Sequence, residues 1–311
     1  MAAIPEIVST EPVTKEGYAY LKDFEKVKGY DFNQGLDYEK LFDSYKNSGI
    51  QATSVGRGIE IINEMIKWRL SDEPIKEDED EKLKDIEVRK NTRCTIFLGY
   101  SSNIMSSGMR EILKYLCQHK MVDCIVTTAG GIEEDFIKCM SDFYVADFHI
   151  KGAELHEMYV NRTGNMLVSN ECYINFQRFF IPIIKECHDE QKEKGTFFTP
   201  SMLINRMGKA INNEDSVYYW CWKNDIPVFC PGFTDGALGD NLYLYNFKEK
   251  GFIVDVSADI CKMDDIAVHA IKSGMILLGG GVSKHHICNA NAFRGGADFA
   301  VYVNTAQEFD C

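Results

Sequence analysis

The chain has 311 residues, 45% of them hydrophobic, and a formal net charge of −13. This length allows a large buried core in one or two domains, and the acidity argues against nucleic acid but suits a cationic partner, or simply solubility. Because the sequence lacks a long apolar run, a signal peptide and any CxxC pair, we predict a cytoplasmic protein with reduced thiols, no membrane span and no metal site.

Residues 1–28 are weakly patterned and are predicted to form an N-terminal helical arm. Amphipathic helices are predicted at 38–45 and 58–68, because apolar residues recur there at helical spacing. The acidic segment 71–87 is predicted to be a solvated loop or a frayed helix. We expect residues 29–311 to form a single α/β domain.

After residue 92, apolar runs of strand length alternate with helical patterns. The runs are CTIFLGY (94–100), VDCIVTT (122–128), IPVFC (226–230), FIVDV (252–256), MILLGGG (275–281) and FAVYV (299–303). A helix after the first run is predicted to bury Met109, Ile112, Leu113 and Leu116, and a helix after the second is predicted to open at Ile132. This alternation predicts a Rossmann-like parallel sheet with helices on both faces.

Ligands of such sheets bind beyond the carboxyl ends of the strands, so the turns after the runs hold the candidate site residues. The first turn, SSNIMSSGMRE from Ser101, could bind phosphate at a helix N-terminus or merely supply a serine N-cap. In the second, AGGIEED, Gly130 and Gly131 permit close approach of a ligand. There, Glu133 and Glu134 could bind a ribose hydroxyl or an ammonium, or simply complement the helix dipole.

Two further turns carry acids and histidines. Asp235 and Asp240 lie in PGFTDGALGD, where aspartate is common in turns but could also bind the ends of an alkylammonium substrate. The glycines before VSKHH let the backbone contact a ligand, and at most one of His285 and His286 is predicted to be catalytic. Without a G-x-G-x-x-G, P-loop, HExxH or GxSxG motif, the turns alone indicate only a nucleotide-binding α/β enzyme.

Taken together, these turns resemble deoxyhypusine synthase in order and spacing, over nearly the whole chain. The longest matching segments are TTAGGIEED (127–135), IPVFCPGFTDGALGD (226–240), GGGVSKHHICNAN (279–291) and ADFAVYVNTAQEFD (297–310). The resemblance implies that NAD takes hydride from spermidine. The aminobutyl group then passes through an enzyme lysine to one lysine of translation initiation factor 5A, the first step of hypusine formation.

The resemblance also implies site residues. For NAD they are Ser102, Asn103, Ile104, Met105, Ser106, Thr128, Ala129, Gly130, Glu134, Asp235, Gly280, Thr305 and Ala306. For spermidine they are Glu133, Glu134, Asp240 and His285. Glu134 and His285 are the catalytic candidates, with His285 as proton acceptor, and the carboxylates would bind ammonium groups through charge-assisted hydrogen bonds. The implied assembly is a homotetramer, a dimer of dimers with shared sites, whose N-terminal arm covers a neighbouring subunit's site.

In this family the covalent lysine lies in an EAVSWGK-like block beyond QEFD, whereas this chain ends at Cys311. The resemblance therefore implies a transferase but not activity of this chain alone, and Lys284 does not align with the family nucleophile. The favoured hypothesis is a deoxyhypusine synthase whose C-terminal segment is missing from the sequence, because the carboxylates and His285 persist.

Three alternatives stay open. The chain could be a non-catalytic subunit that completes and activates a full-length paralogue. It could instead be an NAD-binding regulatory module, which predicts cofactor binding without polyamine affinity. An ordinary NAD-dependent dehydrogenase ranks last, because the glycine fingerprint of that class is missing.

Overall fold

The computed structural model describes residues 14–306, and contacts divide the chain into two units that meet between Ile61 and Ile62. The helices of the first unit are α1 (Lys15–Leu21), α2 (Tyr38–Asp43) and the start of α3 (Ile50–Lys67). Both predicted amphipathic helices are present, although α3 begins earlier than expected. The predicted domain boundary after residue 28 stays a prediction, and residues 1–13 of the predicted arm lie outside the described residues.

The acidic segment 71–87 is more ordered than the sequence suggested. It contains the end of a 3-10 helix (Leu70–Asp72), then α4 (Glu81–Lys84) and the start of α5 (Ile86–Asn91). These pieces surround Arg89, which is only 4% exposed. Its guanidinium donates to the Glu79 carboxylate at 2.7 Å and to the carbonyl oxygens of Leu70 and Glu73 at 2.8 and 2.7 Å. A buried arginine thus organises a segment whose composition predicts only a solvated loop.

The second unit is built on a five-stranded sheet in the order β6-β2-β1-β7-β8. Its strands are β1 (Thr95–Tyr100), β2 (Cys124–Thr127), β6 (Val228–Phe229), β7 (Ser273–Leu278) and β8 (Phe299–Val303). Every neighbouring pair in this sheet is parallel, which confirms the predicted fold class. Strand order reverses between β1 and β7, and such a reversal opens a crevice for ligands at the carboxyl edge.

One predicted strand is wrong. The segment FIVDV forms no strand, and Val254 makes only an isolated bridge with Phe198 before α14 begins at Ser257. Ile253 and Val256 are 53% and 51% exposed. An apolar run of strand length enters a sheet only where a neighbouring edge is available, and composition alone does not reveal that edge.

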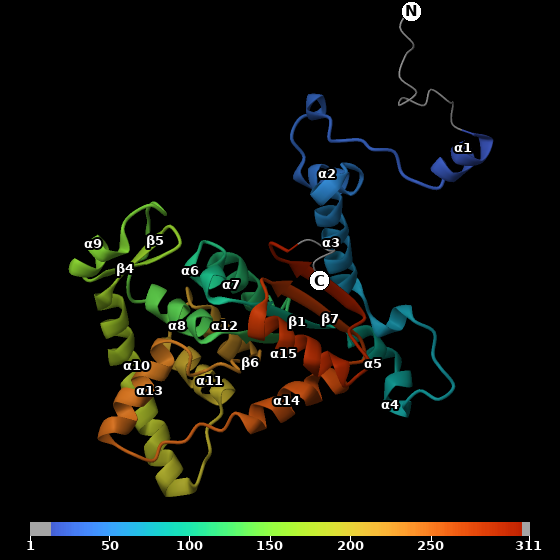
Figure 1. Cartoon of the computed structure of the whole chain (residues 1–311). Helices are drawn as coiled ribbons and strands as arrows, with labels where there is room; N and C mark the ends of the chain where they lie inside the picture. The colour runs from blue at the N-terminus through green and yellow to red at the C-terminus, as the bar shows by residue number, and fades with distance from the viewer. Residues whose placement is uncertain (1–13, 307–311) are drawn as a thin grey trace, which may run out of the picture. The chain divides into compact units, whose positions relative to one another are not determined.

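Helices cover both faces of the sheet (Figure 1). On one face, Phe97, Val126 and Leu277 pack in a core cluster with residues of α14 (Ser257–Val268) and α15 (Gly281–Ala292). On the other face, the Tyr100 hydroxyl meets the Tyr218 hydroxyl at 2.8 Å, and the Tyr218 hydroxyl donates to the Gly131 carbonyl at 2.6 Å. This second layer contains α7 (Arg110–Gln118), α8 (Ala129–Lys138) and α12 (Val217–Asn224).

The remaining elements surround this core. They are α6 (Ser102–Ser106), α9 (Gly152–Glu157), α10 (Asn170–Lys194), α11 (Pro200–Ile211), α13 (Ala237–Lys248) and an antiparallel sheet of β3 (Tyr144–Val145), β5 (Met166–Ser169) and β4 (Val160–Thr163). This small sheet was not predicted from the sequence. Between residues 14 and 306, no helix is both long enough and apolar enough to cross a membrane.

The predicted buried face of α7 is only partly right. Leu113 is buried, but Met109 and Ile112 are 36% and 50% exposed, while Arg110 is 5% exposed. Arg110 Nε donates to the Asp135 carboxylate at 2.7 Å. Arg110 thus occupies a core position that the apolar pattern would assign to Met109 or Ile112. It does so because its ion partner, Asp135, is buried on α8.

Asp135 also ties α8 to α12. Its carboxylate accepts hydrogen bonds from the Ser216 hydroxyl at 2.6 Å and from the backbone N–H of Val217 at 3.1 Å. The buried pair with Arg110 therefore joins three helices that lie against one face of the sheet.

Replacing Arg110 by Met should lower the free energy of unfolding by about 3–5 kcal/mol, because it leaves the Asp135 charge buried without its cation. Chemical denaturation measures this loss. Lys114→Met is the matched control on the same helix, since Lys114 pairs with Asp215, whose side chain is 71% exposed. The control should change stability by about 1 kcal/mol or less, and equal losses for both variants would contradict the role given to the buried pair.

Candidate functional site

The carboxyl ends of the strands lie level with one another. Tyr100 at the end of β1 pairs with Thr127 of β2 and with Leu278 of β7, and Leu278 pairs with Val303 of β8. The turns that follow these strands therefore meet at one edge of the sheet. Apart from Asp235 and the α13 acid Asp240, every predicted site residue follows one of these four strands.

The turns after β1 and β2 are in direct contact. The hydroxyl oxygens of Ser102 and Thr128 are 2.7 Å apart. A Cβ added at Gly130 would lie 2.4 Å from Ser102 Oγ, and one added at Gly131 would lie 2.2 Å from Thr127 Oγ1. Gly130 thus allows the two turns to pack together, and Gly131 allows α8 to pack against the end of β2. That both glycines also permit close approach of a ligand stays a prediction.

The turn after β7 meets the turn after β1. Gly279 has φ of +91° and a Cβ there would lie 3.2 Å from Ser101 Oγ, whereas nothing lies within 4 Å of a Cβ at Gly280. The Ser283 hydroxyl donates to the Tyr100 carbonyl at 3.0 Å. Between the turns after β1 and β7, the space beside Gly279 is therefore filled by Ser101, whereas the space beside Gly280 is free of other atoms of the described chain. Ser101 makes no side-chain N-cap bond to α6, so the serine-capping interpretation is wrong for that helix, whereas the Ser107 hydroxyl accepts from the Met109 N–H at 3.2 Å just before α7.

Glu133 is engaged with a different helix from its own. Because α8 begins at Ala129 and not at Ile132, Glu133 is not in its first turn, and the dipole interpretation is wrong for α8. Glu133 is 6% exposed, and its carboxylate accepts from the Leu238 N–H at 2.9 Å, in the first turn of α13. Burial raises the pKa of this carboxyl, and the charge of Asp240 raises it further, while backbone hydrogen bonds from α13 lower it.

Glu134 is half-buried and faces α6. Its carboxylate accepts a hydrogen bond from the Ser106 hydroxyl. Burial raises its pKa to about 7, the charge of Glu133 contributes in the same direction, and Ser106 and Lys138 oppose the shift. Near neutral pH, Glu134 can therefore both lose and accept a proton.

Tyr173 of α10 belongs to the same region, and sequence reasoning missed it. Burial raises the pKa of its phenol to about 12, with further contributions from the nearby charges of Glu134 and Glu133. No motif or pattern in the sequence singles out Tyr173.

The other predicted residues differ in accessibility. Asp235, Asp240, His285, Thr305 and Ala306 are exposed. Residues Met105 and Ala129 are 0% exposed and Ser106 is 2% exposed, while Asn103 is exposed and its side chain accepts from the Thr163 hydroxyl at 3.3 Å. Through their charges, Asp235 and Asp240 act on Glu133, so these three acids are close to one another. No interaction between His285 and these acids is seen within residues 14–306.

The two adjacent histidines have different surroundings. His286 is partly buried, which lowers its pKa, and the charges of Asp264 and Asp259 on α14 partly offset that effect. His285 is exposed on α15. Of the pair, His285 is therefore the one open to a ligand.

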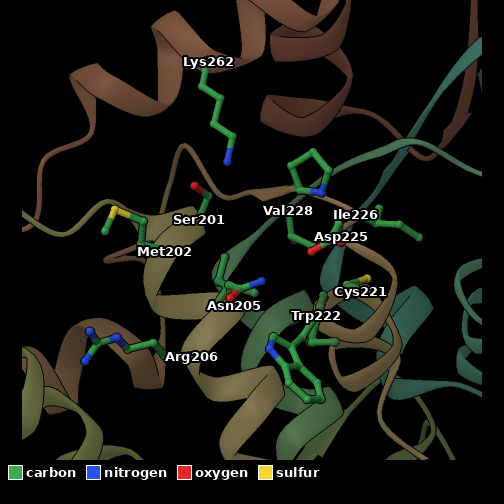
Figure 2. A pocket seen from close by; sticks show the side chains of 13 residues that line it. Ser201, Met202, Asn205, Arg206, Cys221, Trp222, Asp225, Ile226, Val228 and Lys262 are labelled. Carbon is green, nitrogen blue, oxygen red and sulfur yellow. The ribbon is translucent and has the colours of Figure 1, made fainter.

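A separate pocket of about 520 Å³ lies beside β6, between α11, α12 and α14. Figure 2 shows Lys262, Asp225 and Trp222 around it. None of the predicted site residues lines this pocket, so the cavity and the strand-end cluster are distinct features of the molecule.

Comparison with known proteins gives a consistent result. The deoxyhypusine synthase family model matches residues 40–311. A deoxyhypusine synthase of Senecio vernalis is 54% identical, over 92% of this chain and 77% of its own length. A homospermidine synthase of Senecio vulgaris is 50% identical, over 92% of this chain and 78% of its own length. A crystal structure described as a deoxyhypusine synthase from Entamoeba histolytica is 39% identical, with a TM-score of 0.68, and covers 90% of this chain and 88% of that one.

The raised pKa of Glu134 predicts a pH-dependent stability. Its folded-state pKa of about 7 exceeds the ordinary value of 4.5, so the neutral form is favoured by folding, and this contribution is lost as pH rises through 7. Between about pH 5 and pH 8, the free energy of unfolding should therefore fall more in the wild-type chain than in Glu134→Gln. Denaturant titrations across this range measure the difference. Glu157→Gln, a change at an exposed acid of α9, should follow the wild type, and identical profiles for wild type and Glu134→Gln would refute the assignment.

Proposed function

Because the chain belongs to the deoxyhypusine synthase family, whose members are transferases, we propose that it serves the NAD-dependent transfer of the aminobutyl group of spermidine to a lysine of translation initiation factor 5A. One observation carries this proposal. Within residues 14–306, none of Glu133, Glu134, Asp235 and Asp240 forms an ion pair, although two lie in α8, one in α13 and one in the turn before α13, and the charges of Asp235 and Asp240 act on Glu133. Such a cluster attracts a thin polycation.

The turns suit NAD. Nothing lies within 4 Å of a Cβ position at Gly280, so a ligand has room where the strand order reverses. Hydroxyl groups of the turn after β1 lie at the same edge of the sheet. The residues proposed to contact the cofactor are Ser102, Asn103, Ile104, Thr128, Gly130, Glu134, Asp235, Gly280, Thr305 and Ala306. The other three that the resemblance implied, Met105, Ser106 and Ala129, are at most 2% exposed and would act only by supporting these. When bound, NAD would supply the hydride acceptor for amine oxidation.

The chain's own residues bind the amine and move its proton. Glu134 and Asp240 would accept hydrogen bonds from ammonium groups, and a cation beside Glu134 favours its ionised form. Glu133 would contribute mainly through its charge, because the α13 backbone already donates to its carboxylate. His285, exposed on α15, is the proposed acceptor for the proton released on oxidation.

Exposed apolar residues accompany both exposed site residues. On α13, the helix of Asp240, Tyr243 and Phe247 are 69% and 75% exposed, and Phe293, which directly follows α15, the helix of His285, is 66% exposed. Exposed apolar side chains that gather on one surface mark interaction sites. We propose that a second copy of the chain covers these residues, within a homotetramer, a dimer of dimers with shared sites, and that the protein is cytoplasmic. A full-length paralogue is the alternative occupant.

The main test is transfer of label. The protein is incubated with NAD and labelled spermidine, with and without a full-length deoxyhypusine synthase, and with either the factor 5A precursor or a small amine as acceptor. Label on the precursor lysine supports the proposal, and label that appears only in the mixture supports the paralogous-subunit alternative. Label on the small amine alone would favour the activity named for the Senecio vulgaris relative.

A binding test examines the polyamine residues directly. Asp240→Asn should weaken spermidine binding to the NAD-loaded protein by roughly tenfold, which corresponds to about 1.4 kcal/mol, because a charge-assisted hydrogen bond is lost. Calorimetry measures the affinity. Asp225→Asn, at the separate pocket, is the control and should bind as the wild type does. Unchanged affinity in Asp240→Asn would remove that residue from the site, and NAD binding without spermidine binding would support a regulatory module.

A further inference from the structure

Lys138 makes an unusual set of contacts at the end of α8. It is partly buried, and its ammonium donates to three backbone carbonyl oxygens, those of Met105 at 3.3 Å, Ser106 at 3.0 Å and Ser107 at 3.0 Å. An ammonium has three N–H groups, so each has a partner. The Phe143 ring also lies 5.9 Å from this nitrogen.

These carbonyl groups belong to the C-terminal end of α6. This helix spans only Ser102–Ser106, and the chain turns to extended geometry at Ser107. The last carbonyl groups of a helix have no partner within the helix and must be satisfied from outside. Lys138 satisfies them, and its positive charge complements the negative end of the helix dipole.

Glu134 and Lys138 both bind the C-terminal end of α6. They are four residues apart on α8, so they lie on the same face of that helix. Glu134 accepts from the Ser106 hydroxyl, and Lys138 donates to the Ser106 carbonyl. One residue of the predicted cofactor turn is thereby fixed through both its side chain and its backbone.

We propose that Lys138 is a positioning residue for the cofactor: it fixes α6 (Ser102–Ser106) against α8. In this way it determines the positions in which α6 and Glu134 would contact NAD. This inference rests on the proposed function, because that function assigns α6 and Glu134 to NAD. Lys138 itself touches neither cofactor nor substrate in this scheme, and acts through Ser106 and Glu134.

The charges around the pair make its role measurable. Glu133 and Tyr173 lie near Glu134, and Glu111, Arg110, Asp135 and Glu134 act on Lys138. Of these groups, Lys138 is the one cation that lowers the pKa of Glu134. Removing its charge should therefore raise the pKa of Glu134 above about 7, and any loosening of the Ser106 hydrogen bond that Lys138 holds in place would act in the same direction.

The experiment compares Lys138→Met and Lys138→Arg with the wild-type chain. NAD affinity is measured by calorimetry, and the titration midpoint of Glu134 by carbon NMR of labelled glutamate, assigned with Glu134→Gln. Lys138→Met should weaken NAD binding by about tenfold or more and move the midpoint upward, because both the clamp and the charge are lost. Lys138→Arg keeps the charge and should restore the midpoint toward the wild-type value.

Lys114→Met, which removes a lysine of α7 that pairs with Asp215, should leave affinity and midpoint unchanged. Unaltered NAD affinity and an unmoved midpoint in Lys138→Met would overturn the inference. If the wild-type chain does not bind NAD, the proposed function falls instead. In that case the titration midpoint of Glu134 decides the structural part of the inference. An unmoved midpoint in Lys138→Met would overturn that part too.

Discussion

The arrangement of the site depends on the three consecutive acids of α8. Successive side chains of a helix point about 100° apart, so Glu133, Glu134 and Asp135 reach three different partners. Glu133 accepts from the first turn of α13, Glu134 accepts from Ser106 of α6, and Asp135 binds Arg110 and the start of α12. Because α8 follows directly from β2, this triplet fixes the surrounding helices relative to the end of a central strand.

The three acids differ in how their charge is balanced, and this difference separates structural from chemical roles. Asp135 is neutralised by a buried arginine, so it holds helices together and is unavailable to a ligand. Burial raises the pKa of both Glu133 and Glu134. Neither carboxylate is bonded to a cationic side chain within residues 14–306. A site that keeps carboxylates in this state gains most from a ligand that brings positive charge with it. The same local sequence thus contains one acid for stability and two that respond to a cation.

The sequence predicts the parallel sheet and the meeting of its turns well, because both follow from short-range patterns and from the geometry of parallel strands. It fails where a residue's role depends on a distant partner. Nothing near Gly130 in the chain reveals the Ser102 hydroxyl that excludes a Cβ, and nothing near Arg89 reveals the carbonyl groups it binds. Lys138 has the same character, since its three acceptors lie on a turn some thirty residues earlier. The FIVDV segment shows the converse error, because its local pattern is typical of a strand but no neighbouring strand pairs with it.

The site has a buried half and an exposed half, and the contrast bears on how it is completed. Glu133 and Glu134 are fixed by contacts within this chain, whereas Asp240 and His285 are exposed on α13 and α15, with exposed aromatic side chains on α13 and directly after α15. Water around an exposed carboxylate weakens its attraction for an ammonium, and excluding that water strengthens it. A surface that covered α13 and α15 would therefore increase the hold of Asp240 on a polyamine without moving any residue of this chain. In that arrangement assembly and substrate binding favour each other, because each gains from the removal of the same water.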